Sequence, residues 1–61
     1  MTTREKELIK IIKTQDIKTY RLAKDYSFIE WFDKDGKASR VLDCTEPVVK
    51  AVIDRWNECK E

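Results

Sequence analysis

Three features of this chain could carry chemistry: two cysteines, an acidic run around the single glycine, and one oppositely charged pair. The sequence contains no histidine, which removes the commonest general base and metal ligand. Cys44 and Cys59 lie in no motif of a catalytic thiol, and two thiols without histidine cannot complete a zinc site. We therefore expect two free, buried cysteines, and no catalytic residue, cofactor or metal.

The acidic run Asp33-Lys34-Asp35-Gly36 has part of the composition of a calcium-binding loop. When Gly36 is aligned with the glycine of such a loop, Trp31 and Leu42 occupy the first and last ligand positions, which require oxygen donors. The run suits a tight turn better, because aspartate side chains bond nearby backbone and glycine accepts a positive φ. It predicts a hairpin turn and no calcium site.

The segments on either side of this turn predict a β-hairpin over residues 26–42, since the first arm is rich in aromatic and β-branched residues. Glu30 and Arg40 should face each other across it as a solvated ion pair. The same face should carry three aromatic residues of the first arm, which is more apolar surface than a small monomer usually exposes. The candidate partner-binding residues are Tyr26, Phe28, Glu30, Phe32 and Arg40.

Two amphipathic helices flank the hairpin. The first spans Thr3 to Thr14, with Thr2 or Thr3 as its cap, Glu5 or Glu7 in its first turn, and Leu8, Ile9, Ile12 and more marginally Ile11 on one side. The second runs from a Thr45 cap to about Glu58. Its apolar face predicts core and comprises Val48, Val49, Val52, Ile53, Trp56 and Cys59. This helix should hold Cys44 and Cys59 about 20 Å apart, which prevents a disulfide.

The segment Ile17 to Lys24 is open to two interpretations. Residues 19–24 resemble the second helix of phage-repressor helix-turn-helix domains, whereas Ile17, Thr19 and Tyr20, with the aromatic segment that follows, favour a strand. With the strand, the fold class is α+β: a single domain over residues 1–61 in the order α-β-β-β-α. A three-stranded antiparallel sheet then has both helices on one face, which Ile29, Trp31 and either Val41 or Leu42 should contact.

Charge is abundant but nearly balanced: 41% of residues are charged and the formal net charge is +1. Residues 4–24 hold seven basic against three acidic side chains, and residues 25–61 hold six against nine, so the molecule should be dipolar. No apolar run approaches the ~18 residues of a membrane span, and no signal peptide is evident. We expect a cytoplasmic protein with no membrane partner. The candidate nucleic-acid contacts are Lys6, Lys10, Lys13, Lys18, Arg21 and Lys37.

The order of elements resembles small phage-encoded inhibitors, especially compact type II-A anti-CRISPR proteins. The likeness lies in residues 7–13, in the hairpin turn at Asp35-Gly36, and in the pattern Val-Val-x-x-Val-Ile-x-x-Trp that ends at Trp56. It implies a non-enzymatic inhibitor that binds a host protein or nucleoprotein complex, such as a CRISPR-Cas nuclease. Those inhibitors are strongly acidic and imitate DNA, whereas this chain is nearly neutral.

A second resemblance is to the arm-site DNA-binding domains of phage integrases, which place a three-stranded sheet in the major groove. It implies nucleic-acid binding through basic residues of the sheet, with Lys18, Arg21, Lys37 and Arg40 as candidates and Glu30, Asp33 and Asp35 among them. A short chain has a small core, so we expect either a monomer or a weak homodimer.

Overall fold

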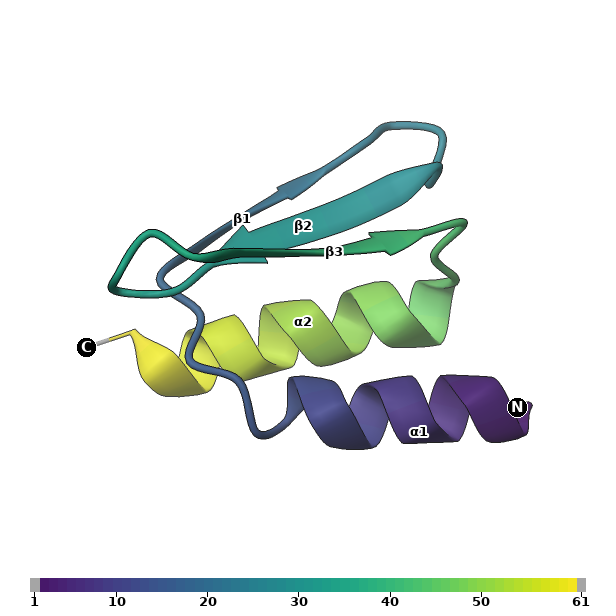
Figure 1. Ribbon diagram of the computed structural model, residues 1–61. Coiled ribbons are helices and arrows are strands. Elements are labelled where there is room, and N and C mark those ends of the chain that lie inside the picture. Colours follow the sequence, from purple (N-terminus) through teal and green to yellow (C-terminus); the bar gives the residue numbers. More distant parts are fainter. Residues whose placement is uncertain (1, 61) are drawn as a thin grey trace.

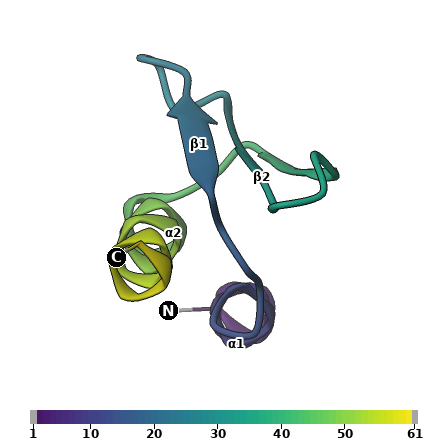
Figure 2. The same cartoon turned by 90° about the vertical axis from the view of Figure 1, so that its left-hand side faces the viewer.

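The computed structural model describes residues 2–60 and has the element order α-β-β-β-α (Figure 1). The elements are α1 (Thr3–Ile12), β1 (Thr19–Leu22), β2 (Phe28–Phe32), β3 (Ala38–Leu42) and α2 (Glu46–Cys59). The strands form one antiparallel sheet in the order β1-β2-β3. Both helices lie on the same side of this sheet (Figure 2). The predicted α+β fold is confirmed, and residues 19–22 form a strand instead of a repressor-like helix.

The sheet has a regular register with β2 at its centre. Residues alternate between its two faces, and one face is directed toward the helices. That face carries Tyr20, Leu22, Ile29, Trp31, Ser39 and Val41. Val41, rather than Leu42, therefore contributes to the core, and Leu42 is left 63% exposed.

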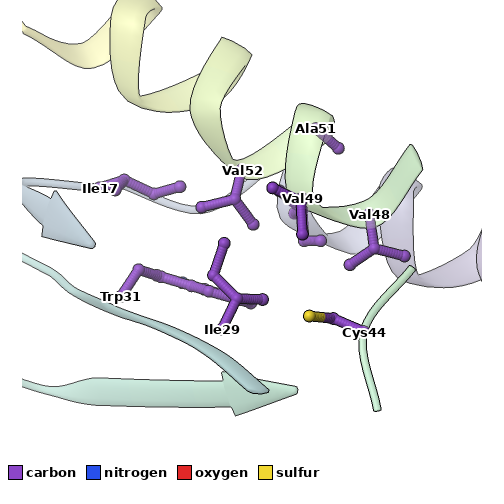
Figure 3. Close-up of a cluster of buried hydrophobic side chains, with 9 residues drawn as sticks. Ile17, Ile29, Trp31, Cys44, Val48, Val49, Ala51 and Val52 are labelled. Atoms are coloured by element: carbon purple, nitrogen blue, oxygen red, sulfur yellow. The ribbon is translucent and has the colours of Figure 1, made fainter. Parts of the chain in front are cut away.

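The core is assembled where α2 packs against the sheet (Figure 3). Ile29 and Trp31 from β2 meet the buried side of α2, with Ile12 of α1 completing the cluster. Each such side chain contributes roughly 1.5–3 kcal/mol on burial. The buried set is Ile12, Ile17, Ile29, Trp31, Cys44, Val48, Val49, Ala51 and Val52.

The linker between α1 and β1 is fastened to α2 by side-chain hydrogen bonds. Arg55 donates from Nε to the carbonyl of Gln15 at 2.6 Å, and Trp56 donates from its indole nitrogen to the carbonyl of Lys18 at 3.0 Å. Ile17, which lies between these two carbonyls, is 2% exposed. Ile17 is thus a core residue of the linker, and the first strand begins at Thr19 instead of Ile17.

The two helix starts lie side by side and share one carboxylate. Thr2 and Glu5 form a capping box at the start of α1. Thr45 occupies the predicted N-cap position of α2, but its side chain makes no capping bond. Its hydroxyl instead donates to Oε2 of Glu5 at 3.0 Å, which joins the helices at their N-terminal ends. Thr45 is thus the N-cap residue of α2, as predicted, but without the side-chain bond that usually accompanies this position.

The predicted turn after β2 is present. Oδ1 of Asp33 accepts from the backbone N–H groups of Asp35 and Lys37, both at 2.9 Å, and Gly36 adopts a φ of 80°. The helix boundaries differ slightly from the predicted ones: α1 ends at Ile12, two residues before Thr14, and α2 ends at Cys59. These differences leave the packing faces unchanged.

Candidate functional site

The side of the sheet that faces away from both helices is called the open face below (Figures 1 and 2). Strand alternation and register assign eight residues to it, in three rows that cross the sheet. The first row is Thr19, Phe32 and Ala38; the middle row is Arg21, Glu30 and Arg40; the third is Phe28 and Leu42.

The middle row is a single ionic network across all three strands. Glu30 lies directly opposite Arg21 on one side and Arg40 on the other. Its Oε1 is 2.5 Å from Nη2 of Arg21, and its Oε2 accepts from Arg40 through Nη2 at 3.1 Å and Nε at 3.3 Å. Both carboxylate oxygens are thus engaged by guanidinium groups, which is the strong form of hydrogen bond.

This arrangement confirms the predicted alignment of Glu30 with Arg40 but corrects the predicted solvation of the pair. The Glu30 side chain is only 8% exposed, whereas Arg21 and Arg40 are 65% and 52% exposed. The carboxylate lies beneath two guanidinium groups that themselves face solvent. Arg21 also belongs to the predicted nucleic-acid set, and the hairpin pattern does not predict its part in this network because it comes from a strand outside the hairpin.

An aromatic ring supports the same two arginines. The guanidinium carbon of Arg40 lies 5.0 Å from the centroid of the Phe28 ring, and that of Arg21 lies 5.5 Å from it. Both distances fall within the range of cation–π attraction. Phe28 is half-buried as a result. The network and the ring therefore hold two long, normally mobile side chains in fixed positions on the surface.

Apolar groups border the network on both sides. Phe32, half-buried, and Ala38, exposed, lie on one side, and Leu42 lies on the other. In the sequence, Leu42 is an alternative to Val41 as a core residue, and its place on the surface was not predicted. Its spacing from Arg40, two positions along one strand, was the signal that places both on the same face.

Tyr26 does not belong to the open face as the hairpin pattern suggested. It precedes β2, in the turn after β1, and has a φ of 61°, which interrupts strand alternation. Its N–H donates to the carbonyl of Ala23, and its carbonyl accepts from the thiol of Cys44 at 3.2 Å. The remaining predicted partner-binding residues, Phe28, Glu30, Phe32 and Arg40, do share the open face.

The candidate nucleic-acid residues are not gathered on one surface. Lys6, Lys10 and Lys13 are exposed on or just after α1, in the helical layer. Lys18 bonds through its backbone N–H to Phe32, at the sheet end where the turn carrying Lys37 also lies. Arg21 lies on the open face. The predicted set is thus divided among three parts of the molecule.

A shallow cavity of about 410 Å³ separates the start of α1 from the link between β3 and α2. Its lining includes Leu8, Val41, Cys44 and Val48, together with the charged residues Arg4 and Glu5. Burial raises the pKa of the Cys44 thiol, which disfavours the reactive thiolate. Cys59 is half-buried and also free. Within residues 2–60, no group of histidine, cysteine or acidic side chains is arranged to hold a metal ion.

Neither a protein-family model, nor a curated protein, nor a solved structure matches this chain. In the described part of the chain, neither helix has the length and continuous apolar character needed to cross a bilayer.

Proposed function

We propose that this chain is a non-enzymatic binding protein that docks on another protein through the open face of its sheet. The observation that carries the proposal is the composition of that face. It presents two exposed arginines with Phe28, Phe32 and a 63% exposed Leu42 around them, and α1 and α2 both lie on the other side of the sheet. Aromatic and arginine side chains are the residues most enriched at protein interfaces.

The ionic network keeps the one carboxylate of this face paired when the face is covered. Glu30 already has both oxygens engaged and is almost inaccessible to water. A partner that covers the face would not leave this carboxylate unpaired, and unpaired buried charge is the usual cost of burying charged residues. The apolar rows on either side would contribute burial of carbon surface.

The resemblance in sequence supports a more specific form of this function. The resemblance to small phage inhibitors implies a host target, and we propose a host protein or nucleoprotein complex, such as a CRISPR-Cas nuclease, as the partner. The mode differs from DNA imitation, since the formal net charge is +1 and the open face carries one carboxylate beside two guanidinium groups.

A purified type II-A nuclease loaded with guide RNA tests this partner class. Plasmid cleavage and direct binding would be measured with wild-type protein, with Leu42→Lys on the open face, and with Ile11→Lys on the helical layer. Ile11 is the matched control because it is likewise apolar and exposed, at 55%. We expect inhibition by wild type and Ile11→Lys and loss of inhibition by Leu42→Lys. Full cleavage in the presence of excess wild type would exclude this nuclease as the partner.

Nucleic-acid binding is the second candidate. The observation in its favour is that Lys6, Lys10 and Lys13 are exposed and form no ion pair within residues 2–60. Fluorescence anisotropy with a short DNA duplex at low salt measures it. Phosphate contacts would lower log affinity by about 0.9 per contact for each tenfold rise in salt. Absence of binding at tens of micromolar protein, on the order of nonspecific affinity, would remove this candidate.

A further inference from the structure

We propose that the open face recognises an acidic side chain of its protein partner, with the partner's carboxylate seated across Arg21 and Arg40. Apolar groups that flank this acidic residue would cover Leu42 on one side and Phe32 on the other. This inference rests on the proposed function, and it names the chemistry of the partner surface.

The open face carries a net positive charge. Among the eight residues of the open face, Arg21 and Arg40 are positive and Glu30 alone is negative. The face therefore carries an uncompensated positive charge at its centre, where both guanidinium groups remain more than half exposed. A negatively charged group is the complement that satisfies it.

Both arginines have N–H donors that do not bond Glu30. Arg40 bonds Glu30 through Nε and Nη2, and Arg21 through Nη2. Neither Nη1 group takes part in a hydrogen bond or ion pair within residues 2–60. Since each guanidinium has five N–H donors, both arginines retain donors that point away from Glu30. The two guanidinium groups therefore keep hydrogen-bonding capacity for a second carboxylate.

The two arginine side chains are preorganised for binding. Free arginine side chains lose rotamer entropy when a ligand orders them. Here Glu30 and the Phe28 ring already hold both arginines, at the distances given above. Glu30 is accordingly a positioning residue, which keeps two like charges beside each other on the surface. An incoming carboxylate would meet donors that are already in place.

A protein carboxylate fits this site better than a nucleic-acid backbone. Duplex binding draws its affinity from many phosphate contacts, whereas the open face has two cations with a carboxylate between them and apolar groups on both sides. An acidic residue in a protein interface is a single anionic group with apolar neighbours. Its charge fixes how the two proteins align, and the apolar contacts bury carbon surface.

The test uses the full-length, ¹⁵N-labelled protein and three synthetic peptides of one shape. The acidic probe is acetyl-Leu-Glu-Phe-Glu-Leu-amide; its twins replace both glutamates by glutamine or by lysine. Nuclear magnetic resonance titration follows the Nε–H signals of Arg21 and Arg40 and the backbone amides of the sheet. We expect the acidic peptide to shift these signals and to bind at least about tenfold more tightly than the glutamine twin, since charge-assisted hydrogen bonds are about twice as strong as neutral ones.

Conservative variants separate recognition from folding. Arg40→Lys keeps a positive charge for Glu30 but removes the guanidinium fork, and it should reduce the preference for the acidic peptide over its glutamine twin. Arg4→Lys is the control, because Arg4 is an exposed arginine of α1, away from the open face. It should leave the preference unchanged.

The outcomes distinguish this inference from the proposed function. Equal binding of acidic and glutamine peptides, with shifts on the open face, would overturn carboxylate recognition and leave the docking face intact. A short DNA duplex that shifts the arginine signals at lower concentration than the acidic peptide would overturn it in favour of phosphate. Concentration-dependent shifts before any peptide is added would instead identify a second copy of this chain as the occupant. Shifts confined to the helices, or none with any peptide, would count against both proposals.

Discussion

Arg40 lies directly opposite Glu30 across the β2–β3 hairpin, and two of its guanidinium nitrogens lie within 3.3 Å of one carboxylate oxygen. This leaves the other carboxylate oxygen for Arg21 of β1. The pair is therefore half of a network that spans the whole sheet, and it stabilises the attachment of β1 to the hairpin as well as the surface proposed for binding.

Neutralising Glu30 should destabilise the fold. In Glu30→Gln the two arginines lose the shared negative partner that holds them beside each other, so we expect a loss of about 1–2 kcal/mol in the free energy of unfolding. This is less than the cost of breaking a fully buried pair, because both arginines reach solvent. Urea denaturation measures it. Glu58→Gln, which removes an exposed partner of Arg55, is the control and should change stability by less than about 0.5 kcal/mol.

The two cysteines should differ in reactivity. Cys44 is buried, and burial raises its pKa, whereas Cys59 is half-buried in the last turn of α2. Alkylation of the native protein near neutral pH should therefore modify Cys44 at least about tenfold more slowly than Cys59, with the difference abolished in denaturant. Peptide mass spectrometry gives both rates. Air oxidation should produce no intramolecular disulfide, because α2 separates the two residues by about 20 Å; finding that bond in folded protein would contradict the architecture.

Stability should decline in acid partly through Glu5. Hydrogen bonds from the Thr45 hydroxyl and from Thr2 lower the pKa of this carboxylate. A carboxylate whose pKa is lower in the folded than in the unfolded chain contributes stability above its ordinary pKa, and that contribution disappears as pH falls through the folded value. Urea midpoints at about pH 6 and at a series of lower pH values follow this loss. Glu5→Gln should shrink the difference between them.

Glu7→Gln is the control for that experiment, since Glu7 is exposed and makes no hydrogen bond or ion pair in the described residues. It should retain the wild-type acid dependence. If both variants behaved as wild type, the bond between Glu5 and Thr45 would have no part in holding the two helix starts together.

Gly36 should be required for its backbone conformation alone. Its φ is 80°, and a Cβ built there meets no atom within 4 Å. Gly36→Ala should therefore cost about 1–2 kcal/mol through left-handed strain, without any steric clash. Gly36→Asn should cost less, since asparagine tolerates this region. Thermal denaturation compares the two; equal losses would point to a role for the glycine beyond its φ.

Local sequence patterns predicted most of the fold. Apolar periodicity placed the two helices, and the turn residues Asp33 and Gly36 set the hairpin and with it the alignment of Glu30 with Arg40. These features depend on residues near one another in sequence. They could therefore be predicted without knowing how the helices and strands pack against one another.

Most of the wrong predictions concern contacts between segments that are far apart in the sequence. Glu30 is buried because Arg21, from a strand whose existence was itself ambiguous in the sequence, covers its second oxygen. The Thr45 hydroxyl is taken by Glu5, 40 positions earlier in the chain. Neither of these two contacts has a local signature strong enough to be predicted. The error at Tyr26 is local instead: Tyr26 lies in a turn, where the Ser27 N–H bonds the Asp25 side chain, and its positive φ interrupts the strand pattern.

The central claim, that the open face is the binding surface, is tested most directly by comparing which proteins are captured by three immobilised forms of the chain. Wild type, Leu42→Lys and Ile11→Lys would be exposed to the same bacterial lysate and their bound proteins quantified by mass spectrometry. Both substitutions place a lysine where an exposed apolar side chain stood, so general effects of charge are matched. The account predicts a protein captured by wild type and Ile11→Lys and lost from Leu42→Lys. Equal capture by all three forms, or loss from Ile11→Lys alone, would contradict it.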